Sequence, residues 1–162
     1  MVTGAAGFIG STLCERLVAD GWSVHGIDAL TDYYDPAVKQ RNVATLLTEP
    51  NFRFVHADLR DTRLGPLLDD VEVVFHLAAQ PGVRTSWADG FATYDDHNIR
   101  VTQRVLEAVR NRPGTRLVFA SSSSVYGNPL RVPTDEADQT RPFSPYGVTK
   151  LAGEHLCRAY AD

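Results

Sequence analysis

Apolar and polar residues follow two regular patterns along the chain. Short runs rich in Val, Ile and Phe, each followed by Gly, Asp or Ser, predict five strands. Between these runs, apolar residues such as Leu13, Leu17 and Val18 recur at three- and four-residue spacing, which predicts helices. The predicted strands are residues 1–3, 23–28, 52–56, 71–76 and 116–121, and the predicted helices are residues 8–20, 37–47, 62–68, 91–110 and 146–161.

The alternation of strands and helices predicts the fold class. Parallel neighbours in a sheet need a crossover connection, and a helix between successive strands supplies it. We therefore expect an α/β fold, a Rossmann-type doubly wound parallel sheet with helices on both faces. The first strand has almost no residues before its glycine motif, and the last helical pattern is still running where the sequence ends. The fold is therefore expected to be truncated at both ends.

Composition and charge argue against several kinds of partner. The 162 residues suit one domain. The net charge of -4 provides no basic surface for nucleic acid or acidic membranes, and the longest apolar runs have the length of strands rather than of membrane spans. No signal-peptide pattern opens the chain, so a cytoplasmic location is expected. Neither Cys14 and Cys157 nor the five histidines show metal-ligand spacing, so no metal site is expected.

A glycine motif follows the first predicted strand, at an end of the sheet where ligands bind in such folds. The stretch TGAAGFIG places glycines at positions 4, 7 and 10 and opens an amphipathic helix. Glycine allows a tight turn and lets a pyrophosphate approach backbone N–H groups at the positive end of the helix. Cofactor contacts are expected from Gly4, Gly7, Phe8, Ile9 and Gly10.

Asp28 ends the second predicted strand and bears on the choice of cofactor. At this position an acid accepts hydrogen bonds from the hydroxyls of the adenosine ribose. The 2′-phosphate of NADP would face this carboxylate, and no arginine or lysine lies between Asp28 and Lys39 to offset it. Lys39 and Arg41 are expected to be charges on a helix surface. The sequence therefore favours NAD over NADP.

Further candidates follow the third and fourth strands. Asp58 and Leu59 follow the third strand. Asp58 could contact adenine, whereas Asp61 or Thr62 could simply cap the next helix. His76 closes the fourth strand and is expected to be a packed histidine rather than a ligand. The small residues Ala78 and Ala79 let the backbone close on the cofactor.

The fifth strand ends in four consecutive serines, Ser121–Ser124, and the stretch YGVTK comes later in the chain. Ser121 is expected to satisfy backbone groups of the turn. Tyr146 and Lys150 would share one face of a helix, an arrangement that also arises as a plain surface pair. A phenol has a pKa of about 10, and a cation at about 4 Å would lower it. Tyr146 could then accept a proton near neutral pH.

Together these motifs resemble the extended short-chain dehydrogenase/reductase family, and within it the NAD-dependent nucleotide-sugar epimerases and dehydratases. Two further stretches, DYYDPAVKQR at 32–41 and AAQPGVR at 78–84, resemble the UDP-glucuronate 4-epimerase branch, with the UDP-glucose 4-epimerases close by. The motifs that carry the family resemblance are TGAAGFIG, Asp28, ADL at 57–59, HLAA at 76–79, Asn98, SSSSVYG and YGVTK.

The resemblance implies a reaction and a set of site residues. Tyr146 would take the proton from the sugar 4-hydroxyl while hydride passes to NAD, and Lys150 would bind the nicotinamide ribose. Ser122 would hydrogen-bond the reacting oxygen. The 4-keto sugar would then turn over and recover the hydride on its other face. Asn98 would join the cofactor-binding residues, and the substrate would meet Arg84, Ser122, Ser123 and Tyr146, although Arg84 could equally be an exposed loop residue.

Ser123 and Ser124 distinguish the reactions of the family. Its dehydratases carry an Asp-Glu pair directly after the catalytic hydroxyl residue, because elimination of water needs an acid and a base. Its UDP-glucuronate decarboxylases keep a Glu just before the VYG valine. The serines at these positions disfavour both reactions and leave 4-epimerisation.

The length of the chain leaves an alternative from another class, a catalytically idle NAD-binding module. Family members are longer, because a second domain completes the nucleotide-sugar pocket. We therefore expect residues 1–162 to be an NAD-binding Rossmann domain without the C-terminal substrate domain. The expected partners are a UDP-linked nucleotide sugar and a second copy of the chain in a homodimer.

Overall fold

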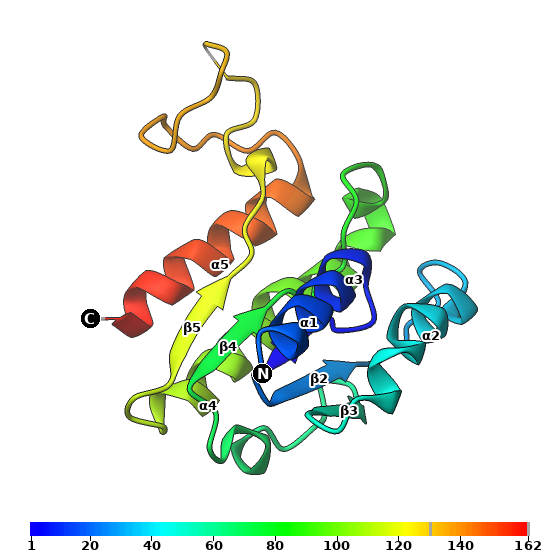
Figure 1. Cartoon of the computed structure of the whole chain (residues 1–162). Helices are drawn as coiled ribbons and strands as arrows, with labels where there is room; N and C mark the ends of the chain where they lie inside the picture. Colours follow the sequence, from blue (N-terminus) through cyan, green and yellow to red (C-terminus); the bar gives the residue numbers. More distant parts are fainter. Residues whose placement is uncertain (130, 162) are drawn as a thin grey trace.

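A parallel sheet of five strands forms the centre of the molecule, as the computed structural model shows for residues 1–129 and 131–161 (Figure 1). The strand order is β3-β2-β1-β4-β5, so the order reverses at β1, which pairs with β2 on one side and β4 on the other. This order confirms the predicted Rossmann-type doubly wound sheet. The strands are β1 Val2–Thr3, β2 Val24–Asp28, β3 Phe52–His56, β4 Val73–His76 and β5 Arg116–Phe119.

Helices cover both faces of the sheet, and each face has its own apolar core. One core joins α1 to β2 and β3 through residues such as Cys14, Val24 and Phe52. The other joins α4 to β2 and β4 through Val105, Ile27 and Val74. In Figure 1, α1 lies in front of the sheet and α4 behind it. The α-helices are α1 Phe8–Ala19, α2 Pro36–Ala44, α3 Phe91–Tyr94, α4 Val101–Arg110 and α5 Pro145–Ala161.

Two predicted helices differ from the observed elements. The helix expected over residues 62–68 is only the 3-10 helix η2, Gly65–Leu68, because Pro66 lacks an N–H and disfavours the α conformation in the residue before it. The helix expected over 91–110 contains a π-helical segment, η5 Asp95–Arg100, between α3 and α4. The remaining short 3-10 helices are η1 Leu46–Thr48, η3 Arg84–Ser86, η4 Ala88–Gly90 and η6 Ser123–Val125.

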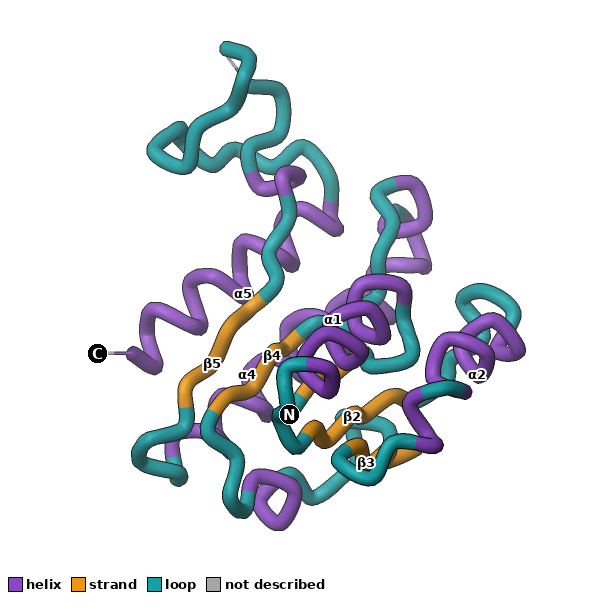
Figure 2. Tube along the Cα trace, in the orientation of Figure 1, coloured by secondary structure: helices purple, strands orange, loops and turns teal. Residues whose placement is uncertain are grey.

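The chain leaves the sheet after β5 and returns in α5. Figure 2 shows the long loop between these two elements extending away from the sheet. Helix α5 begins at Pro145, and the hydroxyl of Ser144 accepts the N–H of Gly147 at 3.1 Å, which caps the helix. Among the residues that the structure describes, no helix is both long and apolar enough to cross a membrane.

The turn between β1 and α1 brings two backbone segments unusually close. Gly4 has φ +71°, in the left-handed region that favours glycine, and a Cβ there would lie 2.9 Å from the N atom of Ala78. A Cβ at Gly10 would lie 2.0 Å from the carbonyl oxygen of Gly4. The start of α1 therefore packs directly on the turn, with no room for a side chain at Gly10.

Gly10→Ala should lower the free energy of unfolding by about 3 kcal/mol, because the added methyl overpacks a contact between backbone atoms. Gly65→Ala is the matched control: a Cβ there meets no atom of the described residues within 4 Å, so its effect should stay within about 0.5 kcal/mol. Urea unfolding of the two variants and the wild type measures both values. Equal stability of the two variants would contradict this view of the turn.

Candidate active site

A cleft of about 440 Å³ lies beside the turn that follows β1, at the carboxyl ends of the strands. It spans the place where the strand order reverses, which is the usual ligand site of such sheets. Of the residues predicted to bind cofactor, Asn98 does not line the cleft. The others do: Gly4, Gly7, Phe8, Ile9, Gly10, Asp28, Asp58, Leu59, Ala78, Ala79, Tyr146 and Lys150.

The start of α1 offers the cleft a positive helix end. Gly7 is the N-cap residue and brings no side chain to pair with the N–H groups of the first turn. These groups have no partner within the helix and carry partial positive charge. Among the described residues, a Cβ at Gly7 would approach only the carbonyl oxygen of Gly4, at 3.3 Å, so the space in front of the loop is open. This arrangement fits a pyrophosphate.

Asp28 holds the glycine loop in place and also faces the cleft. Its Oδ2 accepts the N–H of Ala6 at 3.0 Å, and its Oδ1 accepts the N–H of Leu30 at 2.8 Å. The ammonium of Lys39 lies 3.9 Å from Oδ1. The carboxylate thus ties the end of β2 to the turn after β1.

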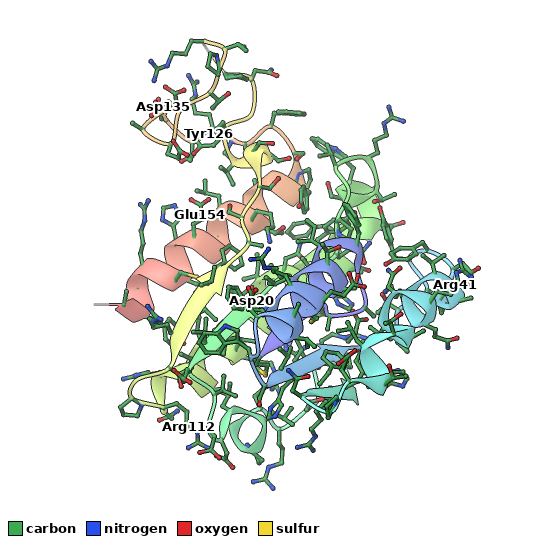
Figure 3. The ribbon with its side chains drawn as sticks, viewed as in Figure 1. Asp20, Arg41, Arg112, Tyr126, Asp135 and Glu154 are labelled. Atoms are coloured by element: carbon green, nitrogen blue, oxygen red, sulfur yellow. The ribbon has the colours of Figure 1, made fainter. Side chains whose placement is uncertain are left out.

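The prediction that Lys39 is a surface charge is wrong, because its side chain is buried against the cleft. Its Nζ donates to Oγ1 of Thr31 at 3.0 Å and lies 5.0 Å from the centre of the Tyr34 ring. Arg41, two residues later on α2, is exposed as predicted (Figure 3).

Asp58 lies at the same end of the cleft as Asp28 and pairs with Arg60. The guanidinium Nη2 of Arg60 lies 2.7 Å from Oδ2 of Asp58, and hydrogen bonds from Arg60 lower the pKa of the Asp58 carboxyl. The backbone carbonyl of Asp58 accepts the N–H of Thr62 at 3.0 Å, so Asp58 also shapes the turn that follows β3. Contact between Asp58 and adenine stays a prediction.

His76 is a packed histidine, as the sequence predicts. Its Nδ1 lies 2.7 Å from Oγ1 of Thr3, and its Nε2 lies 3.2 Å from Oγ1 of Thr102. Burial, with a smaller contribution from the charge of Lys150, lowers the pKa of His76 to about 3. The imidazole is therefore neutral at physiological pH and joins β1, β4 and α4.

Tyr146 and Lys150 line the other end of the cleft from one face of α5. Burial lowers the pKa of Lys150 to about 8, and its Nζ lies 4.4 Å from the centre of the Phe119 ring. The ring of Tyr146 meets that of Tyr94 edge-on, with centroids 6.1 Å apart. The hydroxyl of Tyr94 donates to the carbonyl of Pro81 at 2.8 Å. Tyr94 therefore joins the loop after β4 to the tyrosine predicted to be catalytic.

The serines differ in their surroundings. Ser121 lines the cleft, and its hydroxyl donates to the carboxylate of Glu154 on α5 (Figure 3), so the expectation that it serves only the turn is wrong. Ser122 caps η6, since its Oγ accepts the N–H of Ser124 at 3.1 Å. Neither Ser122 nor Ser123 lines the cleft.

Asn98 and Arg84 also lie outside the cleft lining. The side chain of Asn98 is buried, accepts the N–H of Gln80 at 2.7 Å, and donates to the carbonyl of Gln80 and to Oγ1 of Thr149. It thereby holds the loop after β4 against α5. Arg84 is exposed on η3.

Several cleft residues were not predicted from the sequence. Apart from Lys39, which lies on α2, they lie in irregular loops or on the π-helical segment, where apolar periodicity gives no signal. The stretches DYYDPAVKQR and AAQPGVR, which supplied part of the resemblance, were the available hint for five of them. These residues are Thr31, Tyr33, Tyr34, Lys39, Gln80, Pro81 and His97. Within residues 1–129 and 131–161, no group of three or more His, Cys, Asp or Glu residues is placed to hold a metal ion.

Comparisons with known proteins agree with this geometry. The NAD dependent epimerase/dehydratase family matches residues 1–162. The "Uncharacterized UDP-glucose epimerase YtcB" of Bacillus subtilis is 47% identical over 99% of this chain and 51% of its own length. The UDP-glucose 4-epimerase of Mycolicibacterium smegmatis is 42% identical over 100% of this chain and 51% of its own.

A solved structure shows the same similarity. The UDP-glucuronic acid 4-epimerase of Bacillus cereus, in complex with UDP-glucuronic acid and NAD, matches with a TM-score of 0.94 and 45% identity. The match covers 98% of this chain and 51% of that chain. The chain therefore spans about half the length of the curated relatives and of the solved structure that it matches.

Lys150→Met should stabilise the fold at pH 7 by about 1 to 3 kcal/mol, less than the full pKa shift would give because the contact with Phe119 is lost. The folded pKa of about 8 lies below the ordinary 10.5, so the unfolded chain binds more protons between these values. Wild-type stability therefore rises across this range, and the advantage of the variant should shrink from pH 8 to 10.5.

Urea unfolding at pH 7 and pH 10 measures this difference. Arg158→Met, which removes an exposed cation from the same helix, is the control and should show no such pH dependence. If Lys150→Met were less stable than the wild type at pH 7, burial of the Lys150 charge would not lower the free energy of unfolding, and the prediction would be wrong.

Proposed function

Since the chain belongs to the NAD-dependent epimerase/dehydratase family, we propose that it is the NAD-binding portion of a UDP-sugar 4-epimerase. The matched relatives include UDP-glucose and UDP-glucuronate 4-epimerases, which are isomerases. The observation that carries the proposed reaction is the reactive end of the cleft, where no described lining residue beside Tyr146 and Lys150 is a carboxylate.

The residues of the cleft fit NAD. The glycine turn leaves open space in front of the positive end of α1, which suits the pyrophosphate. Asp28 faces the cleft and suits the hydroxyls of the adenosine ribose. When bound, NAD accepts a hydride from the sugar and later returns it.

Tyr146 and Lys150 supply the proton chemistry in this proposal. Tyr146 accepts the proton of the sugar 4-hydroxyl and returns it after the sugar has turned over. Lys150 binds the nicotinamide ribose and, with its pKa of about 8, still carries its charge at pH 7 in most molecules. The contact with Tyr94 and the cap at Ser144 fix where α5 presents the tyrosine.

The remaining substrate contacts come from the loops around this end. The hydroxyl of Ser122 donates a hydrogen bond to the reacting oxygen, while its Oγ still accepts the N–H of Ser124. Ser123 and Arg84 contact the nucleotide sugar, Arg84 through a carboxylate or the diphosphate. These contacts, the homodimer and the cytoplasmic location stay predictions.

The carboxylates of the cleft argue against dehydration and decarboxylation. Among the described lining residues, the acids are Asp28, which ends β2, and Asp58, which follows β3, both at the adenosine end. Glu154 approaches the reactive end but accepts the Ser121 hydroxyl and does not line the cleft. No acid–base pair therefore stands beside Tyr146 in the described part of the chain, whereas elimination requires one.

The test of the proposal is a coupled assay on the full-length protein with UDP-glucose and UDP-glucuronate. An epimerase releases the C4-inverted sugar nucleotide and keeps its NAD through each turnover. NAD binding without product from any UDP-hexose would instead support the idle NAD-binding module and contradict the proposed reaction.

Tyr146→Phe should reduce turnover at least 100-fold while NAD still binds, because the ring keeps its packing and loses its proton acceptor. Tyr160→Phe, near the end of the same helix and bonded to Glu107, is the control and should keep wild-type turnover. The assay above and calorimetric titration with NAD measure the two properties. Near-wild-type turnover of Tyr146→Phe would refute the assignment.

Ser122→Ala should cost far more activity in the full-length protein than Ser124→Ala, because only the first removes the hydroxyl proposed for the reacting oxygen. Initial rates at saturating substrate give the comparison, and thermal unfolding checks that the fold keeps its stability in both variants. Equal losses in the two variants would place the substrate hydrogen bond elsewhere.

A further inference from the structure

The adenosine end of the cleft contains two opposite charges of similar burial. The side chains of Asp28 and Lys39 are 9% and 8% exposed, and both line the cleft. Lys39 Nζ lies 3.9 Å from Asp28 Oδ1, too far for a hydrogen bond but close enough for strong attraction in a partly dehydrated site. A group that reaches Asp28 from the cleft therefore also meets the ammonium.

Lys39 is held in this position by contacts that leave part of its bonding capacity free. One hydrogen bond goes to Oγ1 of Thr31, and the ring of Tyr34 lies beside the ammonium. An ammonium has three N–H donors, and within residues 1–129 and 131–161 Thr31 is its one hydrogen-bond partner. Donors therefore remain for an acceptor that enters the cleft.

The pair changes the electrostatic argument for choosing NAD. A 2′-phosphate carries a charge of about −1.5 to −2 near neutral pH and is repelled by a lone carboxylate. Here the carboxylate has an adjacent cation, so much of that repulsion is offset. What remains against the 2′-phosphate is the loss of the hydrogen bonds that Asp28 makes with free ribose hydroxyls.

We infer that Lys39 is a specificity-determining residue of the cofactor site, which makes the site reject NADP less strongly than Asp28 alone would. The inference rests on the proposed binding of NAD in this cleft. The carboxylate of Asp28 selects free ribose hydroxyls. The buried ammonium of Lys39 weakens the repulsion between that carboxylate and the 2′-phosphate of NADP.

Calorimetric titration of this chain with NAD and with NADP tests the inference through the ratio of the two dissociation constants. Lys39→Met should raise the ratio of the NADP value to the NAD value at least about tenfold, because the 2′-phosphate then faces an uncompensated carboxylate. Lys39→Arg keeps the cation and should stay within about threefold of the wild type. The same outcome is expected for Arg41→Met, which removes an exposed cation from the same helix.

Asp28→Asn provides the reciprocal measurement and should lower the ratio at least about tenfold, since the cation then stands alone. Thermal unfolding of each variant shows whether the turn after β1 is intact. An unchanged ratio in folded Lys39→Met that still binds NAD would overturn the role of Lys39 and leave the proposed function standing. Failure of the folded wild-type chain to bind NAD would reject both.

Discussion

The contact between Gly10 and the carbonyl of Gly4 is the constraint on which the site depends. It sets the start of α1 directly against the end of a central strand only two residues long. From there the N–H of Ala6 reaches Asp28, which aligns β2 with the same turn. The open space before α1, the acid and the cation beside it are therefore parts of one rigid arrangement.

The reactive end of the cleft is built differently, from side chains that connect separate elements. Asn98 joins the backbone of Gln80 to Thr149, and Tyr94 joins Pro81 to the ring of Tyr146. Both come from α3 or the π-helical segment that follows it, and such segments often occur at functional sites. These two residues act on the proposed chemistry through position.

The sequence predicted what depends on local pattern. Short apolar runs located the strands, and apolar residues at three- and four-residue spacing located four of the helical regions. The motifs located the glycine turn, Asp28, Tyr146 and Lys150 at the cleft. Contacts between distant segments could not be read this way. Lys39 has the local pattern of a surface charge, and its burial follows from how the loop after β2 folds over α2. Ser121 likewise finds its partner, Glu154, only once α5 packs beside β5.

The neutral imidazole of His76 couples the centre of the fold to the acidity of the solution. Its folded pKa of about 3 lies below the ordinary 6.5, so the unfolded chain takes up a proton here that the folded chain does not. The contribution of the neutral His76 imidazole to the stability of the fold is complete above pH 6.5 and is lost progressively as the pH falls toward 3. Acid would thus release the link between β1, β4 and α4, and with it the strand that carries the glycine turn.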